Sequence, residues 1–283
     1  ISTQDGDAAA TLGVVSAVYH WGLHAWAIYA VVGLSLALFH YNKGLPLTIR
    51  SAFYPLLGER IWGWPGHIID ILAVFATLFG LATSLGLGAQ QTSAGLNYLF
   101  DIPNNSSTQV AVIIGITAIA LVSVVRGMDK GVKILSEINM AMAVALMLFV
   151  IAVGPTWSIL EDTVSNTIAY LTYLPALSNW IGREDTAFLH DWTTFYWAWW
   201  VAWSPFVGMF IARVSHGRTV REFLIASLLV PTSVGMIWMT TFGGSAIDQY
   251  LYEGYSGVTD AVNNSDVDLA LFKFREALPY SEI

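Results

Sequence analysis

The chain has 283 residues, of which 55% are hydrophobic and only 11% charged, and its formal net charge is −8. This composition excludes a soluble domain, indicates an integral membrane protein and gives no support to nucleic-acid binding. The absence of cysteine excludes disulfides and thiolate metal sites.

Six apolar stretches are long enough to cross about 30 Å of hydrocarbon as helices. In chain order they are residues 14–39, 66–90, 108–125, 134–154, 192–214 and 222–247. Residues 155–191 mix apolar and charged side chains, which predicts an extramembrane connecting segment with an interfacial helix. We therefore expect an all-α integral membrane protein, with residues 1–283 forming one membrane unit of about six transmembrane helices.

The basic side chains predict the orientation, because loops rich in Lys and Arg stay in the cytoplasm. Nine of the twelve basic residues follow the first, third and fifth stretches: Lys43, Arg50, Arg60, Arg126, Lys130, Lys133, Arg213, Arg218 and Arg221. Most acidic residues lie in the alternate loops and near the two ends. Both ends of the chain are therefore expected on the outer side.

The first stretch carries three aromatic residues that are expected to share one broad helix face. At about 100° per residue, Trp26 is about 140° and Tyr29 about 80° around the helix from Trp21. These rings are candidates for one wall of a binding site.

His20 and His24 lie four residues apart on the same stretch, a spacing that suits a metal or a haem. No other stretch supplies an evident His or Cys partner, so no bound metal is expected. A His-ligated membrane redox protein stays open as a competing interpretation, which a cofactor absorption band would favour.

The fifth stretch contains five of the chain's twelve tryptophans within residues 192–203. Tyr196, Trp200 and Trp203 follow i, i+4, i+7 spacing and make a second aromatic stripe. Packing between helices is one explanation of such a stripe. The density of indole rings with no acid beside them favours a site for a cation that cannot donate hydrogen bonds, above all a quaternary ammonium. Pro205 in the same stretch predicts a kink or hinge.

Three segments resemble the betaine/choline/carnitine transporter family, and most closely its bacterial glycine betaine transporters. They are FYWAWWVAWSPFVGMFIARVSHGRTVREF at 195–223, HWGLHAWAIY at 20–29 and ATLFGLATSLGLGAQQ at 76–91. These segments are similar to the family's eighth, fourth and fifth membrane helices. The resemblance implies a twelve-helix secondary transporter with a LeuT-like core of inverted repeats, of which this chain holds helices four to nine.

The resemblance also implies which residues bind the substrate. Trp21, Trp26 and Tyr29 match the fourth-helix aromatics of the family's central box. Trp200 matches their partner on the eighth helix, and Trp203 lies close by on the same stripe. The ring faces of such a box solvate a trimethylammonium group. A homotrimer is implied by the family alone.

In sodium-coupled members of the family, one ion site uses hydroxyls and an aromatic residue on the fifth and eighth helices. The matching positions in this sequence are Thr77 and Phe206. Leu81 stands where a second threonine is expected, and leucine has no oxygen to bind sodium. This departure weakens the expectation of that particular site.

Together these observations predict a secondary active transporter, not an enzyme, in the inner membrane of a bacterium. The expected substrate is glycine betaine or choline, with sodium as coupling ion and no other cofactor. The alternatives are proton-coupled choline uptake, sodium-independent exchange of carnitine or betaine, and a membrane sensor that binds an osmolyte without moving it. The sequence leaves open which onium compound is moved and how transport is regulated.

Overall fold

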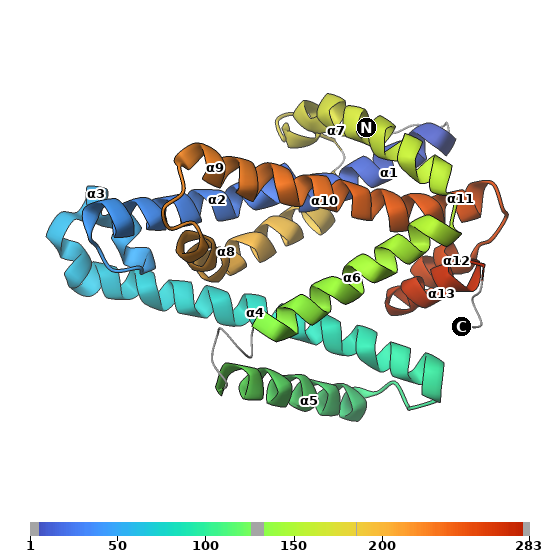
Figure 1. The fold of residues 1–283 in the computed structure, drawn as a ribbon, viewed down its shortest axis with the longest axis horizontal. Helices are drawn as coiled ribbons and strands as arrows, with labels where there is room; N and C mark the ends of the chain where they lie inside the picture. The colour runs from blue at the N-terminus through green and yellow to red at the C-terminus, as the bar shows by residue number, and fades with distance from the viewer. Residues whose placement is uncertain (1–5, 126–132, 185, 280–283) are drawn as a thin grey trace. The chain divides into compact units, whose positions relative to one another are not determined.

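The computed structural model describes residues 6–125, 133–184 and 186–279, and every regular element in these ranges is helical (Figure 1). This confirms the expectation of an all-α protein. The longer helices are α1 (Gly6–Trp21), α2 (Leu23–Ala37), α4 (Trp64–Phe100), α5 (Ser106–Val125), α6 (Lys133–Val153), α7 (Thr156–Ser178), α8 (Phe195–Val214) and α10 (Val230–Met239). The shorter ones are α3 (Tyr54–Leu57), α9 (Val220–Leu224), α11 (Ser245–Leu251), α12 (Gly257–Asn263) and α13 (Ala270–Glu276). Two of the orientation residues, Arg126 and Lys130, lie outside the described residues.

Across the described ranges, five helical segments are long and apolar enough to cross a membrane. They are Gly6–Asn42, Trp64–Phe100, Ser106–Val125, Lys133–Val153 and Val220–Leu251. Most of the remaining predicted span, 192–214, forms helix α8, whose four tryptophans and one tyrosine carry polar groups that lower its hydropathy. A total of six spans stays a prediction, as does the interfacial position of α7 within residues 155–191.

The chain divides into two compact units, which are described separately. One comprises Ile1–Ala82 and Ser165–Ile237, and the other comprises Thr83–Val164 and Trp238–Ile283. The first unit therefore contains α1, α2, α8 and residues 165–178 of α7. Helices α1, α2 and α8 carry most of the predicted site residues. Whether residues 1–283 act as one membrane unit stays a prediction.

The first predicted span, 14–39, lies within the helical segment Gly6–Asn42, which is interrupted at Gly22. Gly22 separates α1 from α2 and has φ −101° and ψ −135°. A Cβ atom at this position would lie 2.6 Å from the Val18 carbonyl oxygen and 3.0 Å from the Tyr170 hydroxyl. Glycine is therefore needed at the break, and the helical angles counted from Trp21 do not hold beyond it.

Within the first unit, α2 packs most extensively against α8. Their backbones approach closely at two glycines. A Cβ atom on Gly208 would lie 3.2 Å from the backbone nitrogen of Gly33, and one on Gly33 would lie 3.2 Å from the carbonyl oxygen of Gly208. Helices approach this closely only where small residues meet. The crossing therefore sets the spacing between the aromatic residues of α2 and those of α8.

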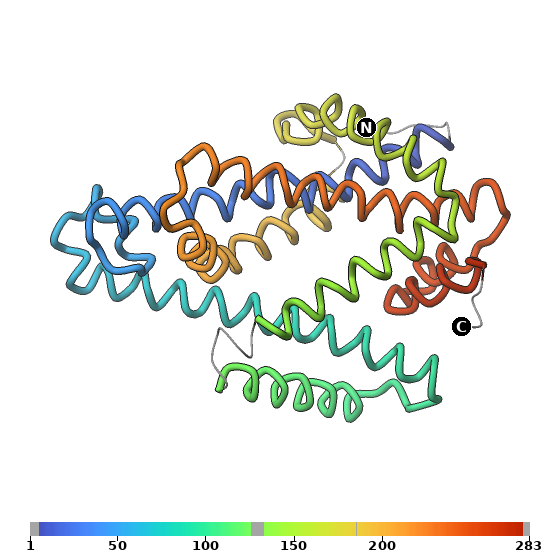
Figure 2. The backbone as a smooth tube through the Cα atoms, viewed as in Figure 1, coloured from blue at the N-terminus to red at the C-terminus, as the bar shows by residue number. Residues whose placement is uncertain are grey.

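The last span, Val220–Leu251, begins with a capping box in which Thr219 and Glu222 exchange hydrogen bonds. Figure 2 shows its backbone as a continuous path through α9, α10 and α11. Two π-helical turns, η6 (Ile225–Leu229) and η7 (Thr240–Gly244), lie within it. Pro231 follows η6 and has no N–H to donate to the preceding turn, which accounts for the disturbed ladder there.

The second unit has a small apolar core where α13 meets α6. Val150, Phe274 and Leu278 are buried together. Beside this core, Glu276 accepts hydrogen bonds from Lys273 and from the phenols of Tyr98 and Tyr255. The hydrogen bond from Lys273, followed by that from Tyr98, lowers the pKa of Glu276 to about 2. The carboxylate therefore stays charged and links the end of α13 to Tyr98 and Tyr255.

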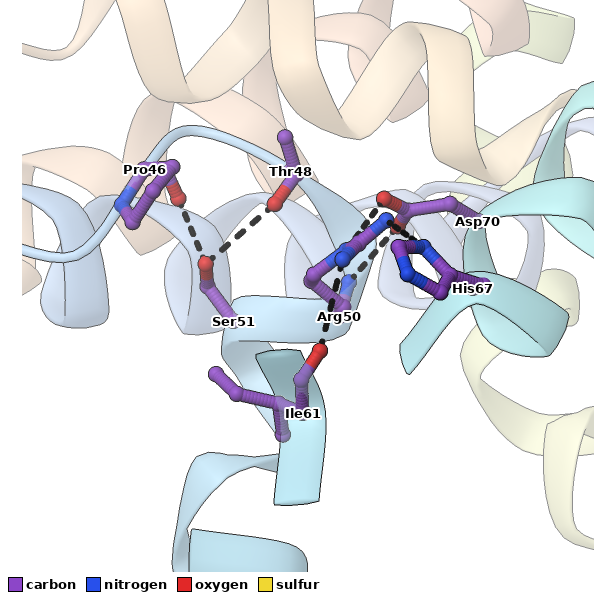
Figure 3. Close-up of polar contacts among 7 residues, drawn as sticks. All are labelled: Pro46, Thr48, Arg50, Ser51, Ile61, His67 and Asp70. Carbon is purple, nitrogen blue, oxygen red and sulfur yellow. Dashed lines mark hydrogen bonds and ion pairs between the residues drawn. The ribbon is translucent and has the colours of Figure 1, made fainter. Parts of the chain in front are cut away.

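A polar network anchors the loop between α2 and α4 in the first unit (Figure 3). The Arg50 guanidinium donates to one carboxylate oxygen of Asp70, and the Arg50 backbone N–H donates to the other at 3.1 Å. The guanidinium also donates to the carbonyl oxygen of Ile61 and lies 3.1 Å from Nδ1 of His67. One arginine therefore joins two points of the loop, at Arg50 and at Ile61, to the first turns of α4.

Replacing Asp70 by asparagine is expected to destabilise the protein by about 1 to 3 kcal/mol, visible as a lower melting temperature in detergent. The Arg50 and Asp70 side chains are only 17% and 27% exposed, so the guanidinium would lose its counter-charge where little water replaces it. The control is Glu137→Gln, since the Lys133–Glu137 pair is 66% and 65% exposed and contributes little. Equal melting temperatures for the two variants would contradict a stabilising role for the network.

Candidate functional site

Four of the predicted site residues form a chain of ring contacts between the first span and α8. Trp21, at the end of α1, meets the indole of Trp200 edge-on, with ring centroids 4.8 Å apart and planes at 82°. Tyr29 of α2 meets the same indole at 5.8 Å and 84°. Trp26 contacts Tyr29 at 5.7 Å and 79°. The structure therefore brings these four rings together, with Trp200 between the two halves of the first span.

The orientation of Trp200 is held by a hydrogen bond and by neighbouring rings. Its Nε1 donates to the carbonyl oxygen of His20 at 2.8 Å. Trp199 lies almost parallel to it, with centroids 5.6 Å apart and planes at 6°. Tyr196, one turn earlier, lies at 6.5 Å and 22°. Because the indole N–H is already satisfied within the protein, the rest of the ring offers only π and apolar surface.

Trp203 lies one turn further along α8 and packs against α4. Its ring centroid is 5.6 Å from that of Phe206. A Cβ atom on Gly80 of α4 would lie 3.2 Å from Cδ1 of Trp203, so the glycine lets the two helices approach. The structure places Trp203 at the α4–α8 contact, and its role as a substrate ligand stays a prediction.

The two residues expected at a sodium site lie one turn from this same contact. Thr77 precedes Gly80 on α4, and its hydroxyl donates to the carbonyl oxygen of Ala73 at 2.9 Å. The hydroxyl oxygen keeps lone pairs that can accept or bind a cation. Phe206 touches the ring of Trp203. Binding of sodium by Thr77 and Phe206 stays a prediction.

The two histidines of the first span each have a hydroxyl partner. The Nε2 atom of His20 lies 3.0 Å from Oγ1 of Thr193, and that of His24 lies 3.0 Å from Oγ of Ser178. His20 also stacks on Tyr196, with ring centroids 4.9 Å apart. Among the residues that the structure describes, no three His, Cys, Asp or Glu side chains gather in a way that would hold a metal ion. Both histidines therefore take part in contacts between helices.

A cavity of about 590 Å³ lies beside α1, and one of the four rings, that of Trp21, lines it. Small residues of α1 form one wall, and aromatic residues of α8 and of the preceding π-helical segment η5 (Phe188–Thr194) form the other. The lining residues are Ala9, Leu12, Gly13, Ser16, Ala17, His20, Trp21, Phe188, Trp192 and Tyr196. None of these lining residues is acidic, which agrees with a site that holds a cation by ring faces.

Three residues that contact or adjoin the aromatic group were absent from the sequence-based site prediction. Trp199 stacks on Trp200, and its only signal was its place in the run of tryptophans. Gly22 interrupts the first span directly after Trp21. Tyr170 bonds to the backbone N–H of a residue 147 positions away, a contact that no spacing pattern predicts.

Similarity to known proteins extends over nearly the whole chain. The sequence model of BCCT, the betaine/carnitine/choline family transporter, matches residues 2–283. A glycine betaine/proline/choline transporter of Vibrio parahaemolyticus is 58% identical over 279 residues, which are 99% of this chain and 50% of the relative. A glycine betaine/proline/choline/ectoine transporter of the same organism is 53% identical over 277 residues, or 97% and 48% of the two chains.

A glycine betaine transporter of Acinetobacter baylyi is 46% identical over 266 residues, which are 94% of this chain and 40% of the relative. The chain spans about half the length of the curated relatives it matches first. These relatives are transporters, not enzymes.

Proposed function

Because the chain belongs to the betaine/carnitine/choline family of transporters, we propose that the intact protein moves a quaternary-ammonium osmolyte across the bacterial inner membrane. Glycine betaine is the first candidate substrate and choline the second. The observation that carries the proposal is the aromatic group of Trp21, Trp26, Tyr29 and Trp200, which two separate helical segments bring together.

The chemistry of these rings suits an onium group. A trimethylammonium head has a diffuse positive charge and no N–H, so ring faces solvate it and no carboxylate is required. Each desolvated contact contributes about 1 to 2 kcal/mol. Several such contacts support micromolar to millimolar affinity, the range of about −8 to −4 kcal/mol.

The proposed mechanism is sodium-coupled symport by alternating access. One bundle of helices would rock against another and expose the aromatic site to each side in turn. The hydroxyl of Thr77 and the ring of Phe206 are the residues proposed near a sodium ion, and Leu81 is the position that argues for a weaker site. A homotrimer and outward-facing ends of this chain segment belong to the same proposal.

The test is uptake of labelled glycine betaine by the intact protein in cells that lack their own onium carriers, with sodium and then with potassium outside. We expect accumulation that depends on sodium. Unlabelled choline should compete well, and proline should compete less well, because its ring nitrogen keeps N–H donors that aromatic faces satisfy poorly. Two relatives have proline in their names, so this comparison bears directly on this chain.

Other outcomes would redirect the proposal. Accumulation that follows a proton gradient instead of sodium would assign proton-coupled uptake. Accumulation only into cells preloaded with carnitine or betaine would assign exchange. Binding without accumulation would contradict transport and favour a sensor.

A further inference from the structure

The interruption at Gly22 places two backbone groups beside the aromatic site. The N–H of Leu23, the first residue of α2, donates to the hydroxyl oxygen of Tyr170 at 3.2 Å. On the other side of the break, the carbonyl oxygen of His20 accepts from Nε1 of Trp200. The first N–H groups of a helix have no partner within the helix and need one from outside. The phenol of Tyr170 therefore acts as a side-chain cap for α2.

Tyr170 is well placed for this N–H. It lies within α7 and is only 2% exposed. A Cβ atom on Gly22 would lie 3.0 Å from the Tyr170 hydroxyl and 3.3 Å from Cγ2 of Thr232 in α10. Residues of three segments that are distant in the sequence, the first span, α7 and α10, therefore meet at the break. Gly22, Tyr170 and Thr232 all belong to the first unit.

The break lies between the two halves of the aromatic site. Trp21 belongs to α1 and meets Trp200 directly before the break. Trp26 and Tyr29 belong to α2, whose first N–H is the one that Tyr170 accepts. A shift of the first turn of α2 would change the position of these two rings relative to Trp21. The hydroxyl of Tyr170 therefore influences how the rings of the aromatic group are placed relative to one another.

We infer that Tyr170 is a positioning residue for the onium site, since its hydroxyl fixes the broken first span so that Trp21 and Tyr29 both face Trp200. The inference rests on the proposed function and adds that a residue of α7 influences the affinity for the substrate. A residue with a structural role alone would change the amount or stability of the protein. A positioning residue changes the KM while protein amount and maximal rate are kept.

The test compares Tyr170→Phe with Tyr173→Phe in the intact protein. Both variants remove one phenol hydroxyl from α7, but only Tyr170 reaches the break. Uptake of labelled glycine betaine is measured for KM and for maximal rate per transporter molecule. We expect Tyr170→Phe to raise the KM about three- to tenfold, as for one lost hydrogen bond, with the maximal rate kept within about twofold. Tyr173→Phe should leave both values unchanged.

A second readout is the binding of glycine betaine to purified protein, followed by tryptophan fluorescence. The glycine betaine concentration that gives half of the fluorescence change should rise in Tyr170→Phe by the same factor as the KM. Three results would each overturn this inference and leave the proposed function standing. The KM of Tyr170→Phe could be unchanged, only the amount of that protein could fall, or the KM of Tyr173→Phe could rise equally. Absence of uptake by the wild-type protein would overturn the proposed function, and this inference with it.

Discussion

Replacing Trp200 by leucine is expected to raise the dissociation constant for glycine betaine by about ten- to a hundredfold. Trp200 is the ring that Trp21 and Tyr29 both meet edge-on, and leucine has neither a π face nor a donor for the His20 carbonyl. The lost cation–π contact and the lost hydrogen bond are together expected to cost about 1.5 to 3 kcal/mol. Calorimetric titration of the purified intact protein measures the change.

Two further variants sharpen this experiment. Trp180→Leu makes the same substitution at a side chain that is 71% exposed, and it should leave the affinity unchanged. Trp200→Phe keeps an aromatic face but loses the N–H, so its affinity should fall between those of wild type and Trp200→Leu. Wild-type affinity in Trp200→Leu would show that the aromatic site has been assigned to the wrong residues.

The lengths of the apolar stretches in the sequence were enough to predict most of the long helices. The stretches at 108–125 and 134–154 coincide closely with α5 and α6, because each is a long apolar run with polar residues at its ends. α4 continues past the predicted end at residue 90 to Phe100. The polar residues after 90 lower the hydropathy but do not interrupt the helix, so composition alone misplaced its end.

The predicted site residues came from spacing on α8 and from the family resemblance. The spacing placed Tyr196 and Trp200 on one stripe, and the structure shows their rings 6.5 Å apart. The break at Gly22 had no comparable signal. A glycine within an apolar run is as compatible with close helix packing as with an interruption, and only the nearby Tyr170 and Val18 oxygens decide between the two. Contacts between distant segments are therefore what the sequence could not predict.

Replacing Gly208 by alanine is expected to lower both the melting temperature and the affinity for glycine betaine. A Cβ atom there would lie 2.6 Å from Cγ1 of Val32 and 3.2 Å from the backbone nitrogen of Gly33. The valine side chain can rotate away, but the backbone nitrogen cannot, so α2 and α8 must separate. Overpacking of this kind costs about 1 to 3 kcal/mol. Tyr29 lies one turn from Gly33 on α2, so the separation also moves its ring away from Trp200.

The crossing can be tested by a matched control and by partial rescue. Gly115→Ala adds the same methyl group to α5, where a Cβ atom meets nothing within 4 Å, and it should be neutral or slightly stabilising because alanine favours helix. Val32→Ala removes the atoms nearest to the new methyl. If the clash is the cause, Val32→Ala should destabilise the Gly208→Ala protein less than it destabilises the wild-type protein. A double-mutant cycle measures this difference. Strictly additive effects would mean that Gly208 acts through something other than this helix crossing.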